Sequence, residues 1–212
     1  MIPDNYLVID LETNGLGRRA HIVQFGWASI EGRKLKSSGA VMIRLPTGAS
    51  MSPGAQDVHN LSIEKLAAEG KDPKETIAAI HEFVSESSDI AGHNIIRFDS
   101  RILNENFLRY GLPTIDFQDK ASVIDTGGLY KARQIAKQKL GNHFMRASET
   151  LYSYEKRIVN RRLSIKWNLN LCASTLNAGE VRGHHDAEED CQYVYRILEA
   201  MRERGWFEEL LC

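Results

Sequence analysis

The order of apolar and polar segments predicts one α/β domain with a mixed sheet. Three strand-like apolar runs come first, at residues 5–12, 21–30 and 39–45. Two shorter runs, at 89–94 and 121–126, then alternate with segments of helical periodicity. Successive strands most simply form an antiparallel meander, whereas strands separated by helices are typical of parallel neighbours. A chain of 212 residues is long enough to build such a domain around its own core.

Helix signals recur between and after these strands. Asp72 is a good cap, Pro73 suits the first turn, and Glu75 completes a capping box. A long helix is expected over residues 186–204, because apolar residues recur there at intervals of four and three. Shorter helices are expected over 63–69, 97–110 and 168–176, whereas 50–62 is rich in loop signals.

Composition favours a cytoplasmic protein without a membrane span. No apolar run approaches the length needed to cross a bilayer. The N-terminus lacks the charged start and long apolar stretch of a signal peptide. The three cysteines, Cys172, Cys191 and Cys212, form no CxxC pair. An odd count without such a pair favours reduced thiols in a reducing compartment.

Charge is distributed unevenly along the chain. The formal net charge is −1, but residues 131–166 hold ten basic and two acidic residues, a segment charge of +8. A basic segment on an otherwise acidic chain suggests a bound polyanion, and the alternative is a solvated helical face. Residues 127–168 show helical patches and no strong strand. We interpret them as a basic, partly helical insertion in a single domain that spans residues 1–212.

Four acidic residues lie where a carboxylate can act chemically. Asp10 and Glu12 are two apart on the first strand, so alternation places both on one face, roughly 6–7 Å apart along the chain. Asp99 lies in the first turn of an expected helix, where the helix dipole alone would favour a negative charge. Asp190 shares the inward stripe of the last helix, where a carboxylate needs a cation or a hydrogen-bonding partner. Each signal is weak by itself.

A histidine stands close to the last of these acids. His185 precedes Asp190 by five residues, at or just outside the start of the helix. A loop histidine can move while the carboxylate stays fixed, which suits a general base for an attacking water. Zinc is the competing interpretation of a histidine and aspartate cluster. Because no cysteine ligands are nearby and carboxylates outnumber imidazoles, magnesium or manganese is favoured.

Three segments, taken in order, resemble the DEDDh family of 3′→5′ exonucleases in the ribonuclease H-like superfamily. They are VIDLETNGL (8–16), GHNIIRFD (92–99) and HDAEED (185–190). The resemblance covers residues 6–126 and 169–200 and is poor over 127–168. It implies a ribonuclease H-like α/β fold, with a mixed five-stranded sheet that begins as an antiparallel meander, continues with parallel strands and is flanked by helices.

The resemblance also implies phosphodiester hydrolysis with two divalent cations, Mg²⁺ or Mn²⁺. The family's four acidic positions are Asp10, Glu12, Asp99 and Asp190 here, and His185 is the family histidine. Asp10 would bridge both cations, Glu12 and Asp190 would complete the first site, and Asp99 would hold the hydration shell of the second. His185 would take a proton from the attacking water, so that a nucleoside 5′-monophosphate leaves.

Contacts to the terminal nucleotide are implied by the same likeness. They fall on Thr13, Asn14 and Leu16, with Leu16 stacking against the last base. His59 and Asn94 are expected to line the same cleft. One departure is Gln24, where many relatives carry glutamate, and we expect no loss of activity from it. The neighbouring His184 is expected to matter much less than His185.

The natural substrate stays open between two polymers. Single-stranded DNA 3′ ends are favoured, because the first two segments are most like those of proofreading-type relatives. A 3′→5′ exoribonuclease that acts on RNA or short oligoribonucleotides is the alternative. A catalytically silent nucleic-acid-binding module is a minor alternative, since all five positions are intact. A proofreading or DNA-repair role bound to a polymerase or other replication or repair protein would use the tail at 206–212 as a tether.

Overall fold

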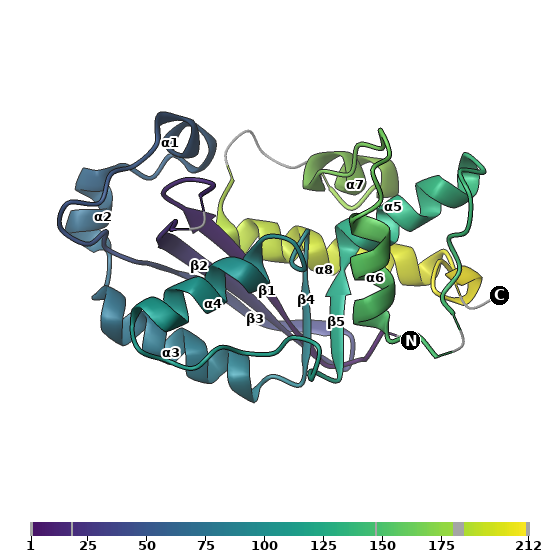
Figure 1. Cartoon of the computed structure of the whole chain (residues 1–212), viewed down its shortest axis with the longest axis horizontal. Coiled ribbons are helices and arrows are strands. Elements are labelled where there is room, and N and C mark those ends of the chain that lie inside the picture. The colour runs from purple at the N-terminus through teal and green to yellow at the C-terminus, as the bar shows by residue number, and fades with distance from the viewer. Residues whose placement is uncertain (1, 18, 147, 180–184, 211–212) are drawn as a thin grey trace.

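The centre of the molecule is a five-stranded sheet in the order β3-β2-β1-β4-β5 (Figure 1). The computed structural model describes residues 2–17, 19–146, 148–179 and 185–210. The antiparallel meander consists of β1 (Tyr6–Thr13), β2 (Ile22–Glu31) and β3 (Lys34–Met42). The strands β4 (Asp89–Gly92) and β5 (Ser122–Asp125) run parallel to β1. The mixed sheet that the sequence predicts is therefore confirmed.

Helices flank the sheet on both faces. In chain order they are α1 (Pro53–His59), α2 (Ile63–Glu69), α3 (Pro73–Glu86), α4 (Asp99–Arg109), α5 (Thr126–Lys137), α6 (Leu151–Val159), α7 (Leu169–Leu176) and α8 (Ala187–Glu203). A short 3₁₀ turn follows at Glu208–Leu210. Within the ranges that the structure describes, no helix is long and apolar enough to cross a membrane.

The two faces of the sheet carry separate apolar cores. α3 and α4 pack on one face, where Leu7 and Ile9 of β1 meet them. α8 crosses the other face with α5, α6 and α7 beside it, and Tyr6 and Val8 point into this second core (Figure 1). Side chains alternate along a strand. Asp10 therefore continues the series that faces α8.

Two elements differ from their predicted form. β3 begins at Lys34 rather than at residue 39, because a two-residue turn at Gly32 and Arg33 pairs it with β2 from its first residue. Residues 50–62 are not all loop, since Ser52 caps α1 and Pro53 occupies its first turn. Those two residues are a helix-start signal, which the polar residues around them outweighed in the sequence. The ends of α8 lie within one residue of the predicted range.

The start of α8 lies directly against the sheet at Gly26. A Cβ atom at this β2 position would lie 2.2 Å from the carbonyl carbon and oxygen of Ala187. Gly26 pairs with Asp10 across β1 and β2. Only glycine therefore allows the first turn of α8 to approach the strand that carries Asp10.

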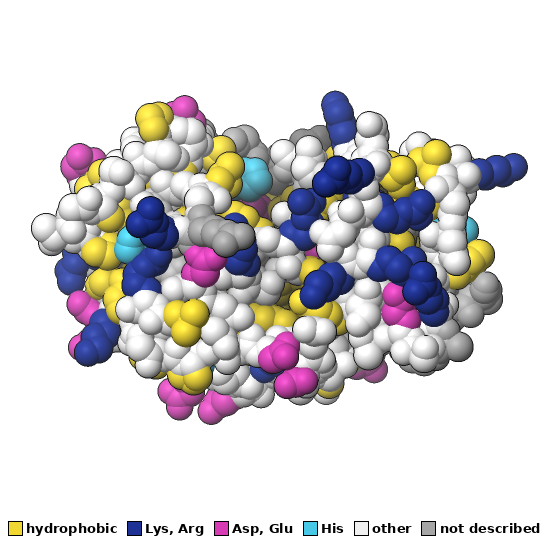
Figure 2. Space-filling view, in the orientation of Figure 1, with side chains coloured by type: hydrophobic (Ala, Val, Ile, Leu, Met, Phe, Trp, Pro, Cys, Tyr) yellow, Lys and Arg dark blue, Asp and Glu magenta, His cyan; other side chains and the backbone are white. Residues whose placement is uncertain are grey.

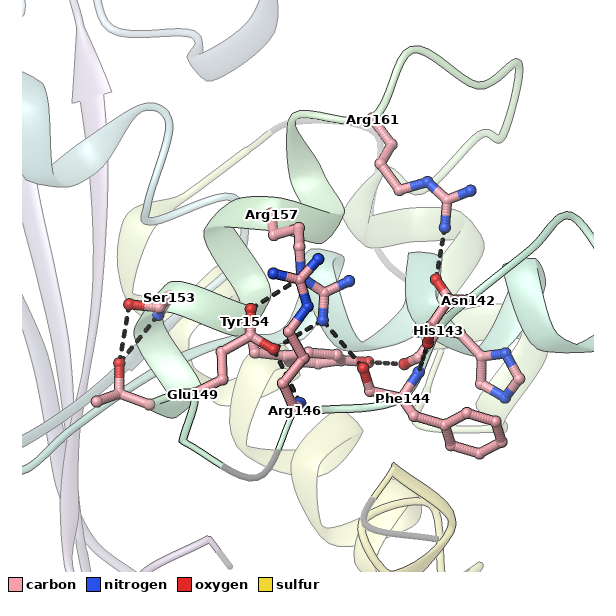
Figure 3. Close-up of polar contacts among 10 residues, drawn as sticks. Asn142, His143, Phe144, Arg146, Glu149, Ser153, Tyr154, Arg157 and Arg161 are labelled. Atoms are coloured by element: carbon pink, nitrogen blue, oxygen red, sulfur yellow. Dashed lines mark hydrogen bonds and ion pairs between the residues drawn. The ribbon is translucent and has the colours of Figure 1, made fainter.

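The basic segment between β5 and α7 is partly occupied by its own contacts. Lys131 is buried, and its ammonium group donates to the carbonyls of Val159 and Arg161. The guanidinium of Arg157 forms two hydrogen bonds to the Glu149 carboxylate (Figure 3). Other Lys and Arg side chains gather at the surface over α5 to α7 (Figure 2). The segment thus contains some Lys and Arg side chains that stabilise the fold and others that are exposed.

The C-terminal tail folds back onto α5. The Trp206 ring lies 6.3 Å from the Tyr130 ring, centroid to centroid, and is buried. Arg133 pairs with Glu209 and also lies over the Trp206 ring. The described part of the tail is therefore docked on its own domain.

Candidate active site

A cleft of about 580 Å³ opens where the parallel strands end. Carboxyl ends of β1, β4 and β5 meet at one edge of the sheet, which is where ligands bind in open α/β sheets. α1 stands on one side of this edge and α7 on the other (Figure 1). The predicted site residues that line the cleft are Asp10, Glu12, Thr13, Leu16, His59, Asn94, Asp99, His185 and Asp190.

Four carboxylates reach the cleft from three elements. Asp10 and Glu12 come from the end of β1, and Leu11 between them is buried in the opposite core. Asp99 is the first residue of α4, which begins directly after the β4–α4 loop. Asp190 lies in the first turn of α8. The chain therefore brings together residues that are 180 positions apart in sequence.

The carboxylates are poorly solvated and oppose one another. Burial and the charges of Asp99, Asp190 and Glu12 raise the pKa of Asp10 well above its usual value. Burial raises the pKa of Glu12 to about 7, although the nearby His185 lowers it. Burial also raises the pKa of Asp99 to about 8, against backbone N–H groups that lower it. Such a cluster is held ionised only by added positive charge.

His185 lies beside Asp190 at the start of α8. Its Nδ1 atom is 2.8 Å from Asp190 Oδ2, and this hydrogen bond raises the pKa of the imidazole. Its backbone N–H donates to the carbonyl of Val58 in α1. The His185 side chain is 38% exposed, so Nε2 remains open to the cleft. His184 lies outside the described residues.

The donor set fits hard divalent cations. One ligand atom each from Glu12, His185 and Asp190 lie within 4.8 Å of one another. Asp10 and Asp99 line the same cleft as this group. Buried carboxylates opposed by a single imidazole need a cation, and carboxylate oxygens are ligands that Mg²⁺ and Mn²⁺ prefer. The residues present therefore fit the cations that the family resemblance implies.

Gln24 fixes the start of α8, a role that sequence reasoning missed. Its Nε2 donates to Asp186 Oδ2 at 3.0 Å, and its Oε1 accepts from the N–H of Ala187 at 3.1 Å. Asp186 in turn caps α8. A glutamate at position 24 would lack the donor and face the Asp186 carboxylate. The available sequence signal was the position of Gln24 in β2, directly opposite Glu12.

The loop after β1 forms the outer wall of the cleft. Leu16 is 83% exposed and lines the cleft, so its apolar surface is open to a base. Asn14 does not line the cleft in this structure. Its side chain donates to the carbonyl of Ser50 and accepts from the N–H of His21, each at 2.7 Å. Asn14 thus braces the wall that carries Leu16.

Two further predicted residues, His59 and Asn94, line the cleft and differ in the hydrogen bonds that their side chains form. The N–H of Leu61 donates to His59 Nδ1, and Nε2 donates to the carbonyl of Thr13. Both ring nitrogens are thus used by the backbone, and burial lowers the pKa of this imidazole. Asn94 adopts a left-handed backbone conformation, with φ of 63°. Its Oδ1 is buried and has no hydrogen-bond partner among the described residues, which suits a donor on a ligand.

The inner wall is made of residues that the sequence did not single out. Trp167, just before α7, and Leu169, its first residue, line the cleft, and His93 lines it from the β4–α4 loop. His93 is half-buried, and desolvation lowers its pKa to about 4. Because residues 163–168 carry no motif and no clear periodicity, only the fold brings them to the site.

The comparison with known families gives a match over most of the chain. A family model described as Exonuclease, RNase_T, matches residues 7–198. No curated protein is similar enough in sequence to count as a match.

Solved structures of Exonuclease I from E. coli share the fold. The zinc-bound form in complex with single-stranded DNA has a TM-score of 0.76 at 17% identity. The complex with a dA16 oligonucleotide has a TM-score of 0.75 at 17% identity. Each covers 98% of this chain, but this chain spans only 42% and 43% of those chains. The fold is therefore ribonuclease H-like, and the match is to less than half of Exonuclease I.

Proposed function

The chain belongs to the exonuclease family RNase_T, and from that premise we propose that it removes nucleotides from the 3′ end of single-stranded DNA. As a member of this family it is a phosphodiester hydrolase of the 3′→5′ exonuclease type. The observation that carries the proposal is the convergence of four carboxylates and His185 in one cleft. The products are nucleoside 5′-monophosphates.

The carboxylates would hold the catalytic cations. Asp10, Glu12 and Asp190 would hold one divalent cation, and Asp10 and Asp99 would hold the other. Asp190 Oδ2 is hydrogen-bonded to His185, and Oδ1 has no such contact among the described residues. When bound, two such ions stabilise the charge on the attacking and leaving oxygens of an in-line displacement.

His185 acts as the general base. Asp190 orients the ring through Nδ1 and raises the pKa of the imidazole, so Nε2 is the atom that accepts the proton. The water oxygen forms a bond to phosphorus as the bond from phosphorus to the 3′-oxygen of the preceding nucleotide breaks. The water's proton passes to His185, and the released 3′-oxygen is protonated from solvent.

Single-stranded DNA is supported by the cleft and by the structural relatives. Leu16 offers an exposed apolar surface to the terminal base, and Asn94 Oδ1 offers an unpaired acceptor. An unpaired base can use both, whereas a base inside a duplex must first leave its stack. The Exonuclease I structures named above contain single-stranded DNA or a dA16 oligonucleotide.

One assay tests direction and polymer together. DNA and RNA strands, single and double, are labelled at the 3′ or 5′ end and incubated with Mg²⁺ or Mn²⁺. We expect single-stranded DNA to give labelled mononucleotide at once from the 3′ label and a descending ladder from the 5′ label. Release of the 5′ label first, or internal cuts, would contradict the proposal. Faster loss of RNA would identify an exoribonuclease instead. Asp10→Ala serves as the control for contaminating nuclease.

A further inference from the structure

The inner wall of the cleft contains a fixed aromatic ring that the roles above do not use. Trp167 is half-buried, lines the cleft and lies on the side opposite Leu16 and α1. Terminal-nucleotide recognition and proton transfer involve other residues. An aromatic side chain at the edge of a nucleic-acid cleft is a platform on which a base can stack.

The ring of Trp167 is held in place by α5. A Cβ atom on Gly127 would lie 2.4 Å from Trp167 Cε3, so the indole rests directly on the glycine. One turn further along α5, Lys131 Nζ lies 5.5 Å from the ring centroid. The Trp167 carbonyl accepts a hydrogen bond from His93 Nε2 at 2.8 Å. The platform is therefore fixed in the absence of a ligand, which lowers the entropy lost on binding.

Two cationic side chains belong to this wall. Lys131 Nζ lies over the Trp167 ring. The Arg97 backbone N–H donates to the carbonyl of Asn94, and Asn94 and Phe98 both line the cleft, so Arg97 stands at its rim. Burial and then the charges of Arg97 and Arg161 lower the pKa of Lys131. Arg161 is committed to backbone carbonyls at Asn142 (Figure 3) and Leu140. The Arg97 side chain is exposed, and no described residue forms a hydrogen bond or ion pair with its guanidinium. A phosphate is the ligand that would satisfy such a guanidinium.

We propose that Trp167 and Arg97 form a second nucleotide subsite, upstream of the terminal nucleotide on the same strand. Trp167 stacks on the base of an upstream nucleotide, and Arg97 pairs with a backbone phosphate beside it. The subsite rests on the proposed function, because it takes the strand whose 3′ end occupies the carboxylate cluster. It selects single strands of two or more nucleotides through base and phosphate contacts that a mononucleotide cannot make.

The test compares a one-nucleotide substrate with oligonucleotides of increasing length. The p-nitrophenyl ester of thymidine 5′-monophosphate has no upstream base and no upstream phosphate, only its leaving group, whereas thymidine oligonucleotides of two to six residues carry both. For Trp167→Ala we expect KM to rise by about 10-fold for the longer oligonucleotides, a size typical of losing one stacked base. Hydrolysis of the ester should stay within about twofold of the wild type. Trp167→Phe keeps a stacking ring and should lose at most about threefold.

The outcomes separate the subsite from the proposed function. If the wild-type protein hydrolysed neither the ester nor the oligonucleotides, the proposed function itself would be wrong. An equal loss on ester and oligonucleotide in both variants would make Trp167 merely structural and overturn the subsite. Unchanged KM for every oligonucleotide would overturn it as well. Arg97→Gln should reduce the salt dependence of oligonucleotide binding by about one phosphate contact, whereas the matched β3 variant Lys36→Gln should not.

Direct stacking has its own optical readout. In the inactive Asp10→Ala background, a thymidine oligonucleotide should quench indole fluorescence. The same titration of Asp10→Ala with Trp167→Phe should show no such change, since Trp27 and Trp206 lie away from the cleft. Equal quenching in both proteins would contradict stacking on Trp167.

Discussion

Asp125 and the cleft acids are buried carboxylates near the same edge of the sheet, and they differ in what stabilises their charge. Asp125, at the end of β5, accepts hydrogen bonds from the N–H groups of Asn94 at 2.9 Å and Gly128 at 3.1 Å. Its neighbour Glu155 of α6 accepts from the N–H of Asp125 at 2.8 Å through one oxygen, and the other oxygen has no partner among the described residues. In the cleft, by contrast, burial and four other carboxylates raise the pKa of Asp10.

The difference lies in the donors rather than in the burial. Burial raises the pKa of Asp125 only to about 6, because backbone N–H groups stabilise its charged form. Among the described residues, no hydrogen bond to Glu12 opposes the effect of burial, and only the charge of His185 lowers its pKa. Asp125 therefore ties the β4–α4 loop to α5 and completes the fold. Repulsion among the cleft carboxylates should lower the stability of the cation-free protein. A bound cation would neutralise that repulsion.

The largest expected effect is at Asp10, where a substitution should abolish activity without lowering stability. Asp10→Ala should lower hydrolysis by about 1,000-fold or more, because both cations lose a ligand. With EDTA present, its unfolding temperature should equal or exceed that of the wild type, since a source of repulsion is gone. Kinetics on a labelled strand and thermal unfolding measure the two quantities. Activity near the wild type with Mg²⁺ or Mn²⁺ would refute the assignment of the cluster.

Replacing His185 tests whether this residue is the general base. His185→Ala should lower turnover by about 100-fold, in the range of general-base catalysis, with little change in strand affinity. His184→Ala is the matched variant and should lose much less. Single-turnover rates with the same strand measure both. The reverse ranking would mean that the other histidine of the pair accepts the proton.

Asp125 should behave in the opposite way to Asp10. Asp125→Ala leaves the N–H groups of Asn94 and Gly128 without their acceptor and should lower the free energy of unfolding by about 2 kcal/mol. Urea unfolding measures the loss, and Asp125→Asn, which keeps one carbonyl acceptor, should lose less. A stability equal to that of the wild type would show that this buried acid is not structural.

Gln24 tests the smaller polar contact that joins the sheet to α8. Gln24→Glu places a carboxylate against Asp186 and should lower stability by about 1 kcal/mol. Adding Asp186→Asn restores a donor and should recover most of that loss. Chemical unfolding of the single and double variants measures the coupling. Additive losses would mean that the two side chains do not interact as described.

The smallest expected effect is a pH dependence of the cation-free protein. Glu12 and Asp99 have pKa values raised to about 7 and about 8, so the folded state retains protons that the unfolded state has lost. Stability in EDTA should therefore fall as the pH rises from 7 to 8, by up to about 1 kcal/mol. Saturating Mg²⁺ should flatten the profile, because the bound carboxylates stay ionised. A profile in EDTA that rises with pH would contradict these shifts.

Alternation and helix caps were enough to predict the sheet and most helices. The antiparallel meander within a mixed sheet followed from segment order, and α8 followed from its apolar intervals. The positions of Asp10, Glu12 and Asp99 were weak signals individually and became specific through the resemblance in three ordered segments. Residues 50–62 show the limit, because Ser52 and Pro53 start a helix in a segment rich in loop residues.

The remaining parts of the site depend on packing that no local pattern encodes. Trp167 reaches the cleft because Gly127 lets its ring lie on α5, and these residues are 40 positions apart. Asp125 has the same residue type and similar burial as the cleft acids, so only its backbone donors reveal a structural role. Gln24 became informative only when α8 was seen to start beside it.

Gly26 has a consequence for how a mutational map of this protein should be read. The residue does not line the cleft, yet any side chain would push Ala187 away from β2. Such a shift would displace Asp190 and His185 together, since both belong to the first turn of α8 or its approach. In a saturation screen scored by activity, position 26 would therefore be as intolerant as a true ligand. Only a parallel score for abundance would tell the two kinds of position apart.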